Sequence, residues 1–68
     1  MEQKKIGKNI KDERIKKGFS CRHLAKRLQL SHTTITRWEK GETCINSVDL
    51  ISVCRVLDIP IKNIVGVL

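Results

Sequence analysis

Apolar residues recur along the chain at intervals of three and four positions, which is the spacing of one face of an α-helix. No run of residues alternates between apolar and polar in the way that a half-buried strand would. The pattern predicts five helices, over residues 4–17, 21–28, 32–40, 47–57 and 60–65. The chain is therefore expected to be all-α.

Residues suited to helix ends stand at these boundaries. Ser20, Ser31 and Asn46 precede three of the predicted helices, and their side chains are good acceptors for the free N–H groups of a first turn. Gly18 and Gly41 follow the first and third helices, where a left-handed residue commonly ends a helix. Residues 20–41 are therefore expected to form two short helices joined by a tight turn.

The charge of the chain is unevenly distributed. The 68 residues carry a net charge of +7, and only Phe19 and Trp38 are aromatic. Residues 1–40 hold twelve Lys and Arg against four acids, whereas residues 41–68 have a net charge of −1. A chain of this length has room for one domain with one small core. The basic half is explained equally well by a polyanionic partner and by a solvated basic surface on the first helix, so charge alone does not decide between them.

The cysteines and histidines do not form a recognisable metal-binding or catalytic motif. Cys21, Cys44 and Cys54 are odd in number, and together with His23 and His32 they fit no zinc-binding spacing. Cys21 and His23 could form a nucleophile pair, but no pocket or third orienting group accompanies them. We therefore expect neither an enzyme nor a cofactor, metal or small-molecule ligand. No charged-then-apolar leader or apolar run of membrane length is present, which favours a reduced cytoplasmic protein that does not contact membranes.

The predicted third helix has one polar face that carries no acidic residue. At 100° per residue, Ile35 and Trp38 fall on the opposite, apolar side. The residues of the polar face are His32, Thr33, Thr36, Arg37 and Lys40. Such a face can donate hydrogen bonds to base edges without repelling phosphates, which is what the major groove of DNA requires.

The chain resembles the Cro/repressor-type (Xre-like) helix-turn-helix family over about residues 5–65. The resemblance rests on Gly18-Phe19-Ser20, Leu24-Ala25, Leu30-Ser31, Ile35, Arg37-Trp38-Glu39-Lys40-Gly41, Leu50 and Leu57. It implies a compact five-helix, lambda-repressor-like domain over residues 1–68, with the helix-turn-helix at residues 20–41. It also implies a transcriptional regulator of prokaryotic or phage origin that binds specific double-stranded DNA.

The resemblance assigns roles to individual residues. The base-reading positions are His32, Thr33, Thr36 and Arg37. The phosphate-contacting positions are Cys21, Ser31, Thr34 and Lys40. Arg37 is the leading base reader, because a guanidinium can pair with both O6 and N7 of guanine. Thr33 would contact a thymine methyl group, and His32 would contact either a purine N7 or the DNA backbone.

Arg14 and Glu39 match a pair that in this family joins the first helix to the end of the third. The helical pattern places Glu39 at the border of the apolar face, where an unpaired carboxylate would be costly. We therefore expect a structural ion pair rather than a catalytic acid.

Four positions depart from the family pattern. Cys21 replaces a glutamine that usually reaches a phosphate, so this contact is expected to be either lost or reduced to a backbone N–H. Gln29 replaces the turn glycine and is expected in a left-handed conformation or an altered turn. Ile45 stands where proline usually precedes the fourth helix, and Glu13 stands in place of a core leucine.

The C-terminal third is richer in apolar residues than a five-helix core requires. Some of these residues must pack on the first helix, so core membership is their first interpretation. The surplus nonetheless predicts a homodimer contact, formed by Val48, Ile51, Ile61, Ile64, Val65, Val67 and Leu68. The resemblance implies a repressor whose two recognition helices lie about 34 Å apart on a near-palindromic operator. Two alternatives remain open: a protein-interaction module such as an antitoxin, and the DNA-binding half of a longer regulator.

Overall fold

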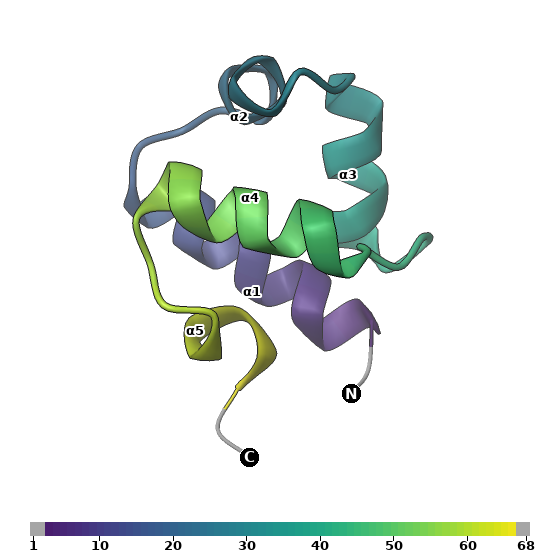
Figure 1. Cartoon of the computed structure of the whole chain (residues 1–68). Helices are drawn as coiled ribbons and strands as arrows, with labels where there is room; N and C mark the ends of the chain where they lie inside the picture. Colours follow the sequence, from purple (N-terminus) through teal and green to yellow (C-terminus); the bar gives the residue numbers. More distant parts are fainter. Residues whose placement is uncertain (1–2, 67–68) are drawn as a thin grey trace.

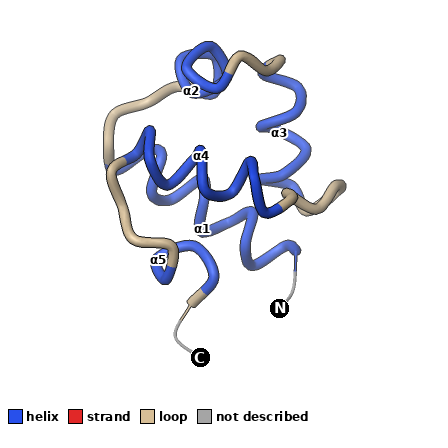
Figure 2. Tube along the Cα trace, viewed as in Figure 1, coloured by secondary structure: helices blue, strands red, loops and turns tan. Residues whose placement is uncertain are grey.

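The computed structural model describes residues 3–66, and this part of the chain forms five helices and no strand (Figures 1 and 2). The helices are α1 (Gln3–Lys16), α2 (Cys21–Leu28), α3 (His32–Lys40), α4 (Ser47–Leu57) and α5 (Lys62–Val65). The predicted all-α fold is confirmed, and the bounds of the first four helices agree within one residue. Helix α1 contacts α3 and α5, while α2 contacts α3 and α4.

The fifth helix begins two residues later than predicted. The Pro60 carbonyl accepts a hydrogen bond from the Asn63 N–H at 3.0 Å, which is a tight i→i+3 turn that places Pro60 outside the helix. Ile61 at the helix boundary supplies no capping side chain. The single-turn helix is instead held against α1, because the Asn9 amide donates to the Ile64 carbonyl at 2.7 Å.

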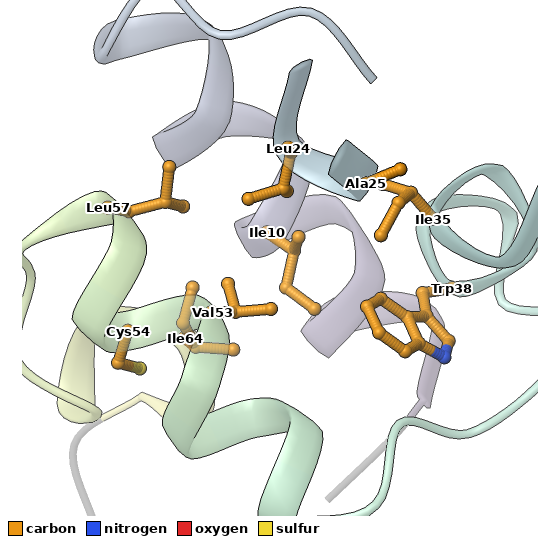
Figure 3. Packing of buried hydrophobic residues seen from close by; sticks show 9 residues of the cluster. All are labelled: Ile10, Leu24, Ala25, Ile35, Trp38, Val53, Cys54, Leu57 and Ile64. Atoms are coloured by element: carbon orange, nitrogen blue, oxygen red, sulfur yellow. The ribbon is translucent and has the colours of Figure 1, made fainter. Parts of the chain in front are cut away.

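One hydrophobic core joins all five helices (Figure 3). Its buried members are Ile10, Leu24, Ala25, Ile35, Trp38, Val53, Cys54, Leu57 and Ile64. Ile35 is fully buried and Trp38 is 4% exposed, which confirms the predicted inward face of α3. Ile64 is also fully buried, so its prediction as a dimer contact is wrong. Its side chain is needed inside, because it anchors the short α5 on the core.

Helix α1 crosses α3 at very close range. A Cβ atom at Gly7 would lie 1.9 Å from the Trp38 carbonyl oxygen and 2.9 Å from its carbon. Only glycine fits at this crossing, although its backbone is ordinary helix. The contact fixes the C-terminal half of α3 against α1.

The turn between α2 and α3 is built from local hydrogen bonds. Gln29 adopts φ 59° and ψ 40°, which confirms the left-handed conformation expected where the family has glycine. The Leu30 N–H then donates to the Ala25 carbonyl at 2.9 Å and closes the end of α2. Ser31 starts α3 by accepting the Thr34 N–H. Figure 1 shows α2 nearly end-on and α3 side-on, so the two helices cross at a steep angle.

Glu13 occupies a buried position that the family pattern gives to leucine. The residue is 9% exposed, yet its carboxylate reaches the Lys16 ammonium group at 3.4 Å. The Lys16 side chain is 70% exposed. Glu13 therefore covers the core with its methylene groups while its charge is paired at the edge.

Candidate nucleic-acid interface

Helix α3 presents a polar and cationic face to solvent. His32, Thr33, Arg37 and Lys40 are exposed, and Thr36 is half-buried. Within residues 3–66, the side chains of Arg37 and Lys40 make no ion pair or hydrogen bond, so their donors are free for a ligand. Ile35 and Trp38 are buried on the opposite side of the helix and hold this face outward.

The hydroxyl groups on α3 are not equally available. The Thr36 hydroxyl donates to the His32 carbonyl at 3.0 Å, so it can offer a ligand only its acceptor sites. The Ser31 and Thr34 hydroxyls lie 3.1 Å apart at the start of the helix, where Ser31 also caps the Thr34 N–H. Thr33 is exposed, and its side chain makes no hydrogen bond within the described residues. Of the three threonines of α3, Thr33 has the hydroxyl group that is most available to a ligand.

Glu39 is the only acidic residue of α3, and it points away from the polar face. Arg14 Nε donates to Glu39 Oε2 at 2.7 Å, and Nη2 donates to Oε1 at 3.2 Å. A third bond runs from Arg14 Nη1 to the Phe19 carbonyl at 2.7 Å. The hydrogen bonds to Glu39 raise the pKa of Arg14, against the opposing effect of burial. The pair ties α1 to the end of α3 and leaves the polar face of α3 without negative charge.

The Cys21 thiol faces this ion pair rather than the surrounding solvent. Its Sγ lies 3.7 Å from Glu39 Oε1, and the residue is half-buried. The thiol is shorter than the glutamine side chain that is usual at this position, and its S–H group donates to the nearby Glu39 carboxylate. The Cys21 backbone N–H lies in the first turn of α2, where no intrahelical partner exists, so it is available to a ligand.

The helix-turn-helix family model matches residues 10–63 of the chain. The chain belongs to the Xre-like helix-turn-helix family of DNA-binding transcription regulators. It is also similar to two crystal structures of the clp gene regulator ClgR from Corynebacterium glutamicum, each at 25% identity over 96% of this chain. Their TM-scores are 0.89 and 0.90, over 84% and 69% of the ClgR chains. No curated protein matches the chain significantly.

The family and the fold of this Xre-like domain are those of DNA-binding regulators rather than enzymes. Within residues 3–66, no group of three His, Cys, Asp or Glu side chains is arranged to hold a metal ion. His23 instead stacks on Phe19, with ring centroids 4.3 Å apart. None of the described helices is long and apolar enough to cross a membrane.

An apolar surface lies on α4 and on the approach to α5 of this Xre-like domain. Val48, Ile51 and Ile61 are 73%, 48% and 49% exposed. Val65 is half-buried, whereas Val67 and Leu68 lie outside the described residues. A shallow groove of about 400 Å³ adjoins this surface, and it is lined by Ile51, Cys54, Arg55, Asp58, Ile59 and Ile61.

One cluster of this regulator was missed by sequence reasoning. Arg22 and Lys26 of α2 and His32 of α3 line a common hollow between the two helices. The i, i+4 spacing of Arg22 and Lys26 indicated a shared face on α2. The proximity of His32 depends on the angle between the helices, which no local pattern contains.

Proposed function

We propose that this Xre-like regulator binds a near-palindromic operator as a homodimer, reads it with α3 and represses transcription by covering a promoter. The observation that carries the proposal is the acid-free outward face of α3. It is held in place by the buried Ile35 and Trp38, while the one acid of the helix is turned inward to Arg14. A surface that offers hydrogen-bond donors and no carboxylate is complementary to the acceptor groups of both base edges and phosphates.

The free side chains of α3 divide into base readers and backbone contacts. The unpaired Arg37 guanidinium is suited to guanine O6 and N7, and the Thr33 methyl group is suited to a thymine methyl. Lys40 at the C-terminal end of α3, and Ser31 and Thr34 at its start, are suited to phosphates that flank the groove.

The apolar groove on α4 supports a symmetric dimer. A twofold interface must be self-complementary, so a patch that carries both a cation and an anion can pair with a second copy of itself. Arg55 and Asp58 both line the groove, both are exposed, and neither makes an ion pair within residues 3–66. In the proposed dimer Arg55 of one copy pairs with Asp58 of the other, around a centre formed by Ile51 and Ile61.

Binding-site selection from randomised duplex, carried out at two salt concentrations, tests the DNA-binding proposal. Arg37→Ala should lose preference at one base position and cost about 1–3 kcal/mol on the selected operator. Lys40→Ala should weaken binding to all sequences and lower the salt slope by about one. Equal losses for Arg37→Ala on selected and random duplex would show that Arg37 does not read a base.

Equilibrium sedimentation of charge-swapped variants tests the dimer. The wild-type protein should be dimeric at micromolar concentration. Arg55→Asp should be monomeric, because it places like charges together, and the double swap Arg55→Asp with Asp58→Arg should restore the dimer. Lys11→Asp, at an exposed position of α1 outside the groove, makes the same change of charge and should remain dimeric. A monomeric wild type that copurifies with a second polypeptide would favour the interaction-module alternative.

Transcription in vitro tests the direction of regulation. With the selected operator placed over a promoter, the protein should reduce the amount of transcript, because bound protein excludes polymerase. An operator moved well upstream of the same promoter should have no effect. More transcript in the presence of the protein would contradict repression.

A further inference from the structure

A small hollow lies where α2 meets the start of α3. It has a volume of about 180 Å³ and is lined by Arg22, Ala25, Lys26, Leu30 and His32. Its floor is apolar, since Ala25 is buried and Leu30 is half-buried. Its rim consists of the three exposed side chains of Arg22, Lys26 and His32. The hollow therefore has a cationic rim around an apolar base.

The chemistry of the hollow selects an anion with several acceptor oxygens. Arg22 and Lys26 stand one helical turn apart on α2 and offer hydrogen-bond donors, while the His32 ring offers one more from α3. None of the three side chains has an ion-pair or hydrogen-bond partner within residues 3–66. The only acidic residue of residues 20–41 is Glu39, which Arg14 engages.

The hollow lies at the N-terminus of α3, where the electrostatic field of the helix favours an anion. His32 is the first residue of α3, a nine-residue helix whose first-turn N–H groups carry partial positive charge. The volume is several times the ~30 Å³ that one water molecule occupies, so a phosphate group fits. A free phosphate ion would remain well hydrated in so shallow a site and would therefore bind weakly. A DNA phosphodiester is held at the hollow by the other contacts between the protein and the duplex.

We propose that this hollow binds one backbone phosphate of the operator, immediately outside the base pairs read by α3; this inference rests on the proposed DNA binding. It assigns His32 to the DNA backbone and leaves base reading to Thr33 and Arg37. His32 precedes Arg37 by five residues, which is about 7.5 Å along the helix axis. The start of α3 is therefore well separated from the position that we assign to guanine recognition.

Affinity for the selected operator, measured by fluorescence anisotropy over a range of salt concentrations, tests the assignment. Arg22→Gln and Lys26→Gln should each weaken binding by about 5- to 30-fold, lower the salt slope by about one and leave the base preference unchanged. Arg27→Gln is the matched control, because Arg27 is an exposed cation of α2 outside the hollow. It should bind within about twofold of the wild type.

A scan of single methylphosphonate linkages identifies the phosphate. One linkage at the operator edge should weaken the wild-type protein, and the same linkage should cause little further loss in Arg22→Gln or Lys26→Gln. Equal losses in the wild type and in the variants would overturn the proposal. So would a His32→Ala variant that loses preference at a base position.

Two further experiments distinguish DNA phosphate from free phosphate, and a failure of the hollow from a failure of the proposed function. Inorganic phosphate alone, followed by the NMR signals of the His32 ring, should give no saturable shift, and tight binding would overturn the assignment to DNA. A wild-type protein that selects no sequence would defeat the proposed function. Specific binding by a wild type whose Arg22→Gln variant behaves like Arg27→Gln would defeat the hollow alone.

Discussion

The Arg14–Glu39 pair should supply a large part of the stability of this small domain, and Glu39→Gln tests this. The carboxylate accepts two guanidinium hydrogen bonds at 2.7 and 3.2 Å. The Arg14 and Glu39 side chains are only 10% and 7% exposed. The substitution keeps the shape of the residue but removes its charge, so the guanidinium is left buried without a counterion.

The expected loss of unfolding free energy in Glu39→Gln follows from these contacts. Removing one partner of a buried ion pair costs about 3–5 kcal/mol. Arg14 retains its 2.7 Å bond to the Phe19 carbonyl, and the new amide oxygen can accept one bond, so the lower end, about 3 kcal/mol, is expected. A 68-residue domain has a total unfolding free energy of only about 3–10 kcal/mol. The variant should therefore be close to the limit of folding at room temperature.

Urea unfolding followed by tryptophan fluorescence measures this cost, because Trp38 is the single tryptophan and is buried. Glu13→Gln is the matched control, since its partner Lys16 is largely exposed and lies 3.4 Å away. It should change the unfolding free energy by less than about 1 kcal/mol. Similar losses for Glu39→Gln and Glu13→Gln would refute the reasoning.

Three other variants test local features of the fold. Gly7→Ala should lower the unfolding free energy by about 1–3 kcal/mol in urea titrations. The clash with the Trp38 carbonyl outweighs a gain of about 1 kcal/mol in helix propensity. A more stable variant would contradict the close crossing of α1 and α3. Gln29→Gly should raise the thermal midpoint, with a gain of about 0.5–1 kcal/mol, because glycine adopts φ 59° without strain. Burial raises the pKa of the Cys54 thiol, so its contribution to stability is present below about pH 8.5 and is lost as pH rises through the folded-state pKa. Under reducing conditions, Cys54→Ala should remove this part of the decline at alkaline pH, and the exposed-site control Cys44→Ala should keep it.

Much of the architecture could be predicted because it depends on residues close together in sequence. Helix periodicity, the N-caps Ser20 and Ser31 and the left-handed Gln29 are properties of single turns of chain. The inward side of α3 also follows from local periodicity, because Ile35 and Trp38 lie on one side of the helix whatever surrounds it. The same argument predicted the outward face that carries the proposed function.

Other features were decided only when the helices packed together. The sequence placed Ile64 among the apolar residues of a predicted dimer contact, whereas in the folded domain it is fully buried in the core. Cys21 stood at a phosphate-contacting position, but its thiol faces Glu39, which lies 18 residues away in sequence. The hollow at Arg22 and His32 exists because α2 and α3 meet at a steep angle. Local sequence sets which side of each helix is apolar, whereas long-range packing sets which polar groups from different helices come together.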